Sequence, residues 1–233
     1  MSNSPLATVT ILSPNCAKPR THVIDRITPH CVVGQCSVEA LGNLFASPHR
    51  NASSNYGIGV DGRIALYVEE CNRAWTSSDV KNDDRAVTIE CASDIEAPWA
   101  FRDAVYESLV DLCVDICKRN GKSRLLWLKE KDISLAYNPR SNEMVLTVHR
   151  WFANKACPGD WMMDRMGDLA ERVTEALNPQ IRPWYADAME WAANNGLIRD
   201  GRPNDTVTRA ELATVLYRIY GPEDEKKSSG LLL

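Results

Sequence analysis

The chain has 233 residues, of which 44% are hydrophobic and 25% are charged. These values fit a globular protein with one sizeable core, or a core and a small module, and they exclude fibrous and disordered classes. The 27 basic and 31 acidic residues give a net charge of −4, so we expect binding neither to nucleic acid nor to an anionic membrane. No stretch reaches the roughly 18 apolar residues of a membrane span.

The N-terminal segment and the cysteines indicate a cellular compartment. Met1–Ala17 carries no charge, and polar residues interrupt it, so it lacks the basic start and the apolar run of a secretory signal. We therefore expect the chain to be made and folded in a cytoplasm. Most of its eight cysteines should then be free thiols. Cys113 and Cys117 stand four residues apart in a helical pattern, which is typical of small buried thiols.

The first part of the chain shows strand patterns. Residues 8–12 and 22–27 are β-branched and apolar runs beside proline and asparagine, typical of short strands, and residues 1–20 otherwise resemble a loose lead-in. Tyr56–Val68 holds an Asp-Gly pair between apolar runs, which predicts a β-hairpin. Residues 86–89 predict a further strand, at whose end Glu90 stands.

Two amphipathic helices are interleaved with further strands. Apolar residues recur at helical spacing from Phe101 to Ile116, after Pro98 and before Gly121, which predicts a helix of about six turns. A second apolar stripe runs from Met162 to Leu177. The expected later strands are residues 125–128, 133–137 and 144–148. This alternation predicts an α/β or α+β fold with a mixed central β-sheet flanked by helices.

A proline-rich break over residues 178–183 predicts a domain boundary. Beyond it, Trp184–Ala192 indicates a short helix ended by Gly196, and a second helix begins at Thr208, where Thr208 and Glu211 form a capping box. The charged and then Ser/Gly-rich tail is expected to be disordered. The predicted organisation is a lead-in (1–20), a catalytic domain (21–178), a helical segment (179–222) and a tail (223–233).

Few residues can serve as nitrogen or sulfur ligands of a metal. The four histidines are residues 22, 30, 49 and 149. His30 closes the first strand, and His149 ends a later strand and precedes Cys157 by eight residues. Two neutral imidazoles and one thiolate suit a catalytic zinc ion, because three protein ligands leave the fourth position for water. This spacing alone is weak, since a histidine at a strand end is usually not a ligand.

Several separated segments follow one family's pattern in order. They are His30, residues 55–62 with Tyr56 before the Asp-Gly turn, Ala74-Trp75-Thr76, residues 87–93 with Glu90, and the run from His149 to Cys157-Pro158-Gly159 with Lys155. From about His22 to Leu177 the chain resembles the zinc-dependent N-acetylmuramoyl-L-alanine amidases of the peptidoglycan-recognition-protein type. That family includes amidase-type phage lysozymes and prophage endolysins. Gly57 and Thr76 depart from it, since many relatives carry histidine there.

The resemblance implies zinc bound by His30, His149 and Cys157. It also implies hydrolysis of the amide bond between muramic acid and L-alanine in bacterial peptidoglycan, with zinc activating water. The matching assisting residues are Tyr56, Glu90 and Lys155. Lys155 would stabilise the developing oxyanion, Glu90 would carry a proton from the water to the departing amine, and Tyr56 would donate a hydrogen bond to the carbonyl.

Each assisting role has a simpler alternative. Tyr56 can be a half-buried strand aromatic, Lys155 a surface lysine, and Glu90 a helix cap or a solvated carboxylate. Period-two alternation turns Cys31 away from His30, so we interpret Cys31 as a core thiol. His22 and His49 lack counterparts in the family and are expected at the surface. Asp160 and Asp164 are expected to favour the start of the last helix of the domain.

The segment over residues 184–220 resembles part of an S-layer homology module. Such modules hold cell-wall polysaccharide, and the alternatives are packing on the catalytic domain or self-association into a homodimer. Together with the missing signal, this resemblance favours a prophage-type endolysin that waits in the cytoplasm for a holin. The alternatives are a cytosolic amidase that recycles muropeptides, a non-catalytic peptidoglycan-binding protein and a structural wall-anchored protein.

Overall fold

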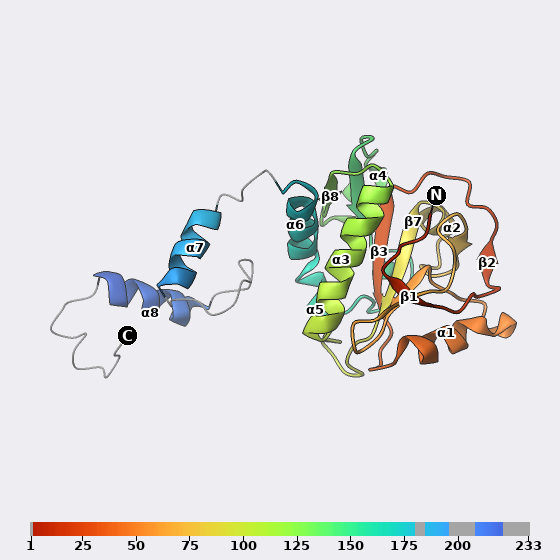
Figure 1. Cartoon of the computed structure of the whole chain (residues 1–233), viewed down its shortest axis with the longest axis horizontal. Coiled ribbons are helices and arrows are strands. Elements are labelled where there is room, and N and C mark those ends of the chain that lie inside the picture. The colour runs from red at the N-terminus through yellow and green to blue at the C-terminus, as the bar shows by residue number, and fades with distance from the viewer. Residues whose placement is uncertain (1, 180–184, 196–207, 221–233) are drawn as a thin grey trace. The chain divides into compact units, whose positions relative to one another are not determined.

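The computed structural model describes residues 2–179, 185–195 and 208–220, and the chain divides into two units, Met1–Arg182 and Pro183–Leu233 (Figure 1). The division lies within the predicted boundary segment. The described part of the second unit holds α7 (Ala186–Asn194) and α8 (Arg209–Tyr220). The predictions for Trp184, Gly196, the side chain of Glu211 and the tail lie outside the described residues. None of the described helices has the length and apolar character that crossing a bilayer requires.

The first unit is built on a seven-stranded sheet in the order β1-β5-β4-β7-β3-β9-β8. Its strands are β1 (Ala7–Thr10), β3 (Arg26–Cys31), β4 (Tyr56–Ile58), β5 (Ile64–Leu66), β7 (Ala86–Cys91), β8 (Arg124–Leu126) and β9 (Glu143–Leu146). Neighbours are parallel except β4 and β5, which form the antiparallel hairpin that the Asp-Gly pair predicts. A separate antiparallel pair joins β2 (Cys16–Ala17) and β6 (Arg73–Ala74). The predicted mixed sheet flanked by helices is confirmed.

Helices α3 (Asp103–Arg119) and α6 (Met166–Leu177) lie together on one face of the sheet (Figure 1). Their apolar stripes pack with Ile27 of β3 and Ile89 of β7 in the main core, where both isoleucines are fully buried. Two helices that the sequence did not predict, α1 (Val38–Ala46) and α2 (Val80–Asp83), contact other parts of the sheet. The main core therefore lies between the sheet and α3 with α6.

The two predicted helices of the first unit differ from the structure in their extent. Helix α3 begins at Asp103 and not at Pro98, because Trp99 has a φ of 59°, in the left-handed region where a right-handed helix cannot continue. The predicted second helix is divided into α5 (Asp160–Met163) and α6. In both helices the predicted apolar stripe is nevertheless the buried one.

The prediction of a strand at residues 133–137 is wrong, because this segment forms helix α4 (Lys131–Ala136). Its short run of apolar residues indicates a strand. In the structure Ser134 is 1% exposed, whereas Ile133 is 58% exposed. The helix therefore packs through a small polar residue, and the apolar run does not match the burial.

The N-terminal residues are part of the folded unit and not the loose lead-in that we expected. Strand β1 pairs in parallel with β5. The backbone N–H of Ser4 donates to Tyr56 Oη at 2.7 Å, and Tyr56 Oη donates to Glu70 Oε1 at 2.6 Å. Glu70, which is 1% exposed, also accepts from Arg119 Nη2 at 2.5 Å. This buried polar cluster anchors the N-terminus to α3.

We predict that Arg119→Leu lowers the free energy of unfolding by about 3 kcal/mol, because it leaves the Glu70 carboxylate buried without its cation. Urea denaturation followed by circular dichroism measures the change. The matched control is Arg172→Leu, which breaks an ion pair with Glu107, a side chain that is 54% exposed. That loss should stay below about 1 kcal/mol. Equal losses for the two variants would contradict the anchoring role of the buried pair.

Candidate active site

The site begins at the carboxyl ends of the central strands. Strands β3 and β7 pair in parallel with His30 opposite Glu90. The neighbouring residue Ile89 packs in the core under α3, so strand alternation directs Glu90 and its partner His30 to the opposite face of the sheet. His149 lies in the 3₁₀ helix η2 (His149–Trp151), which follows β9, the strand on the other side of β3. The sheet therefore brings three distant segments of the chain together.

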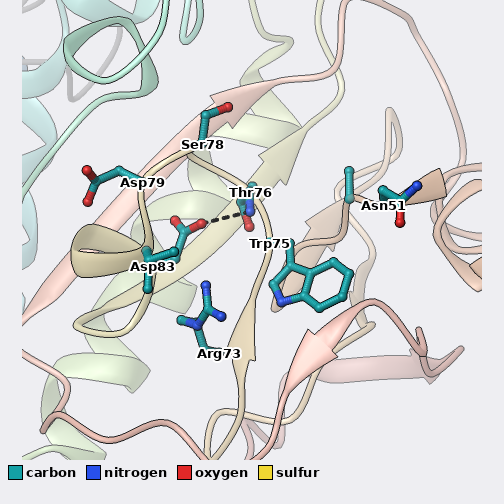
Figure 2. A pocket seen from close by; sticks show the side chains of 9 residues that line it. Asn51, Arg73, Trp75, Thr76, Ser78, Asp79 and Asp83 are labelled. Carbon is teal, nitrogen blue, oxygen red and sulfur yellow. Dashed lines mark hydrogen bonds between the residues drawn. The ribbon is translucent and has the colours of Figure 1, made fainter.

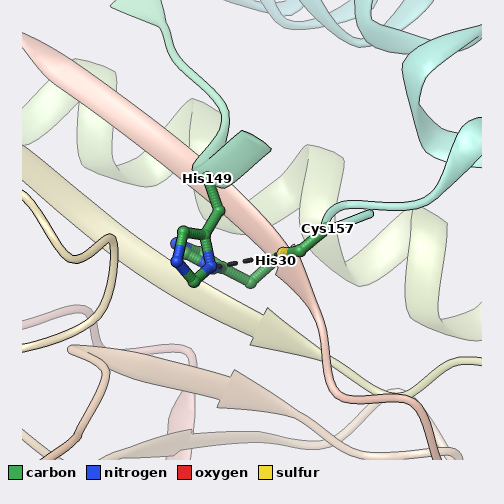
Figure 3. A group of neighbouring side chains, drawn as sticks. All are labelled: His30, His149 and Cys157. Carbon is green, nitrogen blue, oxygen red and sulfur yellow. Dashed lines mark hydrogen bonds between the residues drawn. The ribbon is translucent and has the colours of Figure 1, made fainter. Parts of the chain in front are cut away.

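His30, His149 and Cys157 meet at this point (Figure 3). Each offers one possible ligand atom, and these atoms all lie within 4.8 Å of one another. His30 Nδ1 is 3.3 Å from Cys157 Sγ, and the two imidazole centroids are 5.0 Å apart. In the part of the chain that the structure describes, this is the group of three or more His, Cys, Asp or Glu side chains that could hold a metal ion.

Hydroxyl and amide groups orient the three side chains. Ser77 Oγ lies 3.5 Å from His30 Nε2, and Ser78 Oγ lies 3.3 Å from His149 Nε2. These contacts leave the Nδ1 atom of each ring for a metal ion. The backbone N–H of Cys31 donates to Cys157 Sγ at 3.4 Å, which favours a thiolate. All three contacts belong to the outer layer that normally fixes metal ligands.

The carboxylate of Asp83 holds the backbone of Thr76 and Ser77 in place. It accepts a hydrogen bond from the backbone N–H of Thr76 at 2.9 Å (Figure 2). It also accepts one from the backbone N–H of Ser77 at 3.0 Å. Asp83 is 2% exposed, and burial raises the pKa of this carboxyl above its usual value. The segment before α2 is thus tied to a buried acceptor, which positions Ser77 beside His30.

The donor set fits a zinc ion. Nitrogen and sulfur atoms bound tetrahedrally to one zinc at about 2.0 and 2.3 Å lie about 3.5 Å apart, close to the 3.3 Å between His30 and Cys157. Burial and the neighbouring His149 lower the pKa of His30 well below its usual value, and burial and Lys155 lower that of His149. Both rings are therefore neutral at pH 7, the form that binds metal.

A cavity of about 500 Å³ opens onto the three side chains and is also lined by Glu90 and Lys155. Glu90 Oε1 is 4.0 Å from His30 Nδ1, and its side chain is 17% exposed. Burial, with a smaller contribution from Cys31, raises the pKa of Glu90 to about 8. A carboxyl group in this range can exchange a proton near neutral pH. Lys155 is exposed and places an ammonium group at the same cavity.

The comparison with protein families identifies the chain. Residues 20–160 match the N-acetylmuramoyl-L-alanine amidase family. The chain belongs to this amidase family. No curated protein matches the sequence.

The chain is similar to several solved structures at low sequence identity. The structure of AmpD is 20% identical with a TM-score of 0.50, covering 75% of this chain and 95% of that one. A mutant of PlyL is 13% identical with a TM-score of 0.48, covering 71% and 96%. The endolysin amidase LysCS from Clostridium intestinale is 16% identical with a TM-score of 0.42, covering 69% and 91%.

Tyr56 is not brought to the amidase site, so this assignment from the sequence is corrected. Tyr56 pairs with Ile89 across β4 and β7, and it therefore projects into the main core on the opposite face from Glu90. Its side chain is fully buried, and its hydroxyl donates to Glu70. Burial and the Glu70 carboxylate raise the pKa of Tyr56 well above its usual value. The simpler interpretation, a buried strand aromatic, is the one the structure supports.

The sequence does not predict that buried polar residues lie beneath the amidase site. Asn82 Nδ2 donates to Thr28 Oγ1 at 3.1 Å and to Ser77 Oγ at 3.2 Å, while Asn82 Oδ1 accepts from Thr147 Oγ1 at 3.0 Å. One signal could have located this segment. Asp79 caps α2 by accepting from the Asn82 N–H at 2.7 Å, and an Asp before a short polar helix is a recognisable start.

The other expectations for histidines and cysteines agree with the structure. His22 and His49 are exposed. Cys31 is 8% exposed and packs in the main core, as do Cys113 and Cys117. All eight cysteines are free thiols. Asp160 begins α5, and its carboxylate also forms an ion pair with Arg150 at 3.1 Å.

We predict that the chain binds about one zinc ion and that binding releases about two protons at pH 7, one from the Cys157 thiol and one from the Glu90 carboxyl group. Burial raises the pKa of Cys157 well above its usual value, so the thiol is protonated before a dication displaces the proton. Zinc affinity should therefore rise with pH until the pKa of the thiol is reached. Calorimetric titration with zinc in two buffers of different protonation enthalpy gives the number of protons that zinc binding releases.

Cys157→Ser should lower the zinc affinity at least about tenfold, because it removes the sulfur ligand. Cys71→Ser removes an exposed thiol and serves as the matched control. Metal analysis after dialysis compares the two variants. Full zinc content in Cys157→Ser would exclude Cys157 as a ligand.

Proposed function

We propose that the chain is a zinc-dependent amidase that hydrolyses the bond between N-acetylmuramic acid and L-alanine in bacterial peptidoglycan. The observation that supports this most directly is the meeting of His30, His149 and Cys157 within 4.8 Å at one cavity, in a chain of the amidase family. Peptidoglycan is accordingly the proposed partner of this site. A zinc ion bound there would supply a Lewis acid for the water and for the amide carbonyl.

Glu90 is the proposed proton carrier. Its carboxyl group lies 4.0 Å from His30 Nδ1 and lines the cavity, where a water molecule and the scissile amide have to meet. Its pKa of about 8 belongs to the surroundings without a cation, and a neighbouring dication lowers it toward the ionised form. The carboxylate accepts a proton from the attacking water. The same proton then passes to the departing amine, which leaves in its neutral form.

Lys155 is the proposed stabiliser of negative charge. The residue precedes Cys157 by two positions and lines the same cavity. Its charge reaches the site, since it contributes to the lowered pKa of His149. During attack on the amide the carbonyl oxygen becomes an oxyanion, and the ammonium group of Lys155 offsets this charge.

We predict that Lys155→Ala and Glu90→Gln each lower kcat by about 10²- to 10³-fold while the zinc content stays the same. Both side chains act on the transition state, whereas neither is a proposed ligand. The matched control is Tyr56→Phe, which should keep kcat per folded molecule because its hydroxyl lies on the other face of the sheet. An unchanged kcat in either of the first two variants would remove that residue from the mechanism.

The function itself is tested on purified cell walls. Mass spectrometry of the digest should show free stem peptides that begin with L-alanine. Unaltered walls that nevertheless retain the protein would indicate a non-catalytic peptidoglycan-binding protein. Cleavage of soluble muropeptides but not of walls would indicate a recycling amidase.

We propose that the second unit binds the cell wall by contacting its polysaccharide. The alternative role of this unit is to pair two chains into a homodimer. The proposal is supported by apolar side chains that are exposed in the described part of this unit. Trp191 of α7 is 61% exposed, and Leu212 and Val215 of α8 are 54% and 50% exposed. With this unit we propose a prophage endolysin setting, in which the enzyme stays in the cytoplasm until a holin releases it.

We predict that a chain ending at Gln180 keeps its zinc and its rate on soluble muropeptides but binds purified walls less well. Trp191→Ala in the full chain should weaken wall binding in the same direction, because it removes an exposed aromatic ring. Sedimentation with insoluble walls measures both, and ultracentrifugation gives the oligomeric state. Unchanged wall binding in both variants would contradict the targeting role, and loss of soluble activity would assign the second unit to the catalytic fold.

A further inference from the structure

A basic groove lies beside the metal centre and is not used by the mechanism above. It is a cavity of about 430 Å³ lined by four basic side chains, Arg26, Lys81, Arg85 and Lys131, and by the rings of Trp151 and Phe152. Arg26 begins strand β3, Lys81 belongs to α2, Lys131 to α4 and Trp151 to the 3₁₀ helix η2. Its positive charge contrasts with the net charge of −4 of the chain.

Arg26 is the buried member of the groove. Its side chain is 5% exposed, and its guanidinium donates to Asn82 Oδ1 at 3.2 Å and to the Leu135 carbonyl at 3.5 Å. Among the described residues, no carboxylate forms an ion pair with it within 4.0 Å. A guanidinium has five N–H donors in a planar fork, and a buried cation without a counter-ion is costly. The guanidinium of Arg26 is thus a buried cation at a cavity, and it has more N–H donors than these two hydrogen bonds use.

The carboxylates near Arg26 are engaged by other partners. Asp25 accepts two hydrogen bonds from Arg85, at 2.9 and 2.5 Å. Asp79, which also lines the groove, caps α2 through the N–H of Asn82. Lys81 and Lys131 are exposed at the groove. The groove therefore keeps an excess of positive charge, and its chemistry suits a carboxylate or a phosphate.

The position of the groove connects it to the candidate metal centre. Trp151 and His149 belong to the same short helix, and Asp79 directly follows Ser78, whose hydroxyl lies 3.3 Å from His149 Nε2. Trp151 stacks on Trp127 with ring centroids 5.3 Å apart and planes 4° from parallel, so its ring is held in place. A substrate with its scissile bond at the metal centre can therefore extend past His149 into the groove.

We propose that the basic groove binds a carboxylate of the peptide stem of peptidoglycan, with Arg26 at its base and Lys81 and Lys131 at its entrance. The assignment of the anion to the stem rests on the proposed amidase function. Phosphate shares the same chemistry, so the experiment has to separate the two anions. The groove would make the enzyme prefer stems with free carboxylates over stems with amidated ones.

Binding is measured in the full chain carrying Glu90→Gln, so that turnover does not consume the ligand. Calorimetry compares a soluble muramyl peptide with free carboxylates and the same peptide with its carboxylates amidated. The free form should bind about tenfold more tightly, as expected for charge-assisted hydrogen bonds. Lys81→Gln with Lys131→Gln should remove this preference. Lys18→Gln with Lys118→Gln removes the same charge from exposed positions outside the groove and should leave the preference unchanged.

Three outcomes would overturn the proposal. Equal affinity for the two peptides would show that no carboxylate is recognised. A preference that survives in the Lys81 and Lys131 variant would place the recognition elsewhere. Competition by millimolar inorganic phosphate, without a preference between the peptides, would assign the groove to phosphate. Absence of hydrolysis by the unmodified chain would contradict the amidase function and not the groove. The binding of the two peptides would then still test whether the groove recognises a carboxylate.

Discussion

The parallel register between β3 and β7 is the constraint on which the site depends. It sets His30 beside Glu90 on one face of the sheet and Ile27 and Ile89 toward α3 on the other. Because side chains alternate along a strand, a shift by one residue would move the histidine into the core and an isoleucine into the site. Burial of the isoleucines opposes such a shift. The apolar core therefore positions the proposed metal ligands, and one of them, Cys157, packs against it.

The polar residues under the site form the second layer of this arrangement. Thr28, Thr147 and Asn82 are fully buried, and they satisfy one another's hydrogen bonds. Buried polar groups are costly without partners, so this cluster is stable in one arrangement only, and Ser77 is part of it. Since Ser77 contacts His30 and is held by Asp83, the cluster fixes the orientation of the ring. The buried polar groups therefore hold the imidazole ring of His30 in a defined orientation.

The sequence predicts those features that depend on local pattern. The hairpin and the apolar stripes of α3 and α6 follow from turn residues and periodicity. The approach of His30, His149 and Cys157 follows from the resemblance to the amidase family. The face on which Tyr56 lies does not, because it depends on the register between β4 and β7, and that register is set by tertiary packing. Helix α4 was missed for a related reason, since its apolar residues are not the buried ones. Arg26, Lys81 and Lys131 come from three separate elements and share no spacing.

The net charge of −4 argues against attraction of polyanions to the chain as a whole, yet the charge near the site has the opposite sign. Lys155 lies at one cavity beside His149, and the basic groove lies at another. Focused positive potential within a cleft can attract an anionic substrate even when the net charge is negative. Asp83 links the two regions, because it holds the segment from Thr76 to Ser78, which contacts the histidines and leads into Asp79 at the groove. A change in this segment would therefore alter both the proposed metal site and the basic groove.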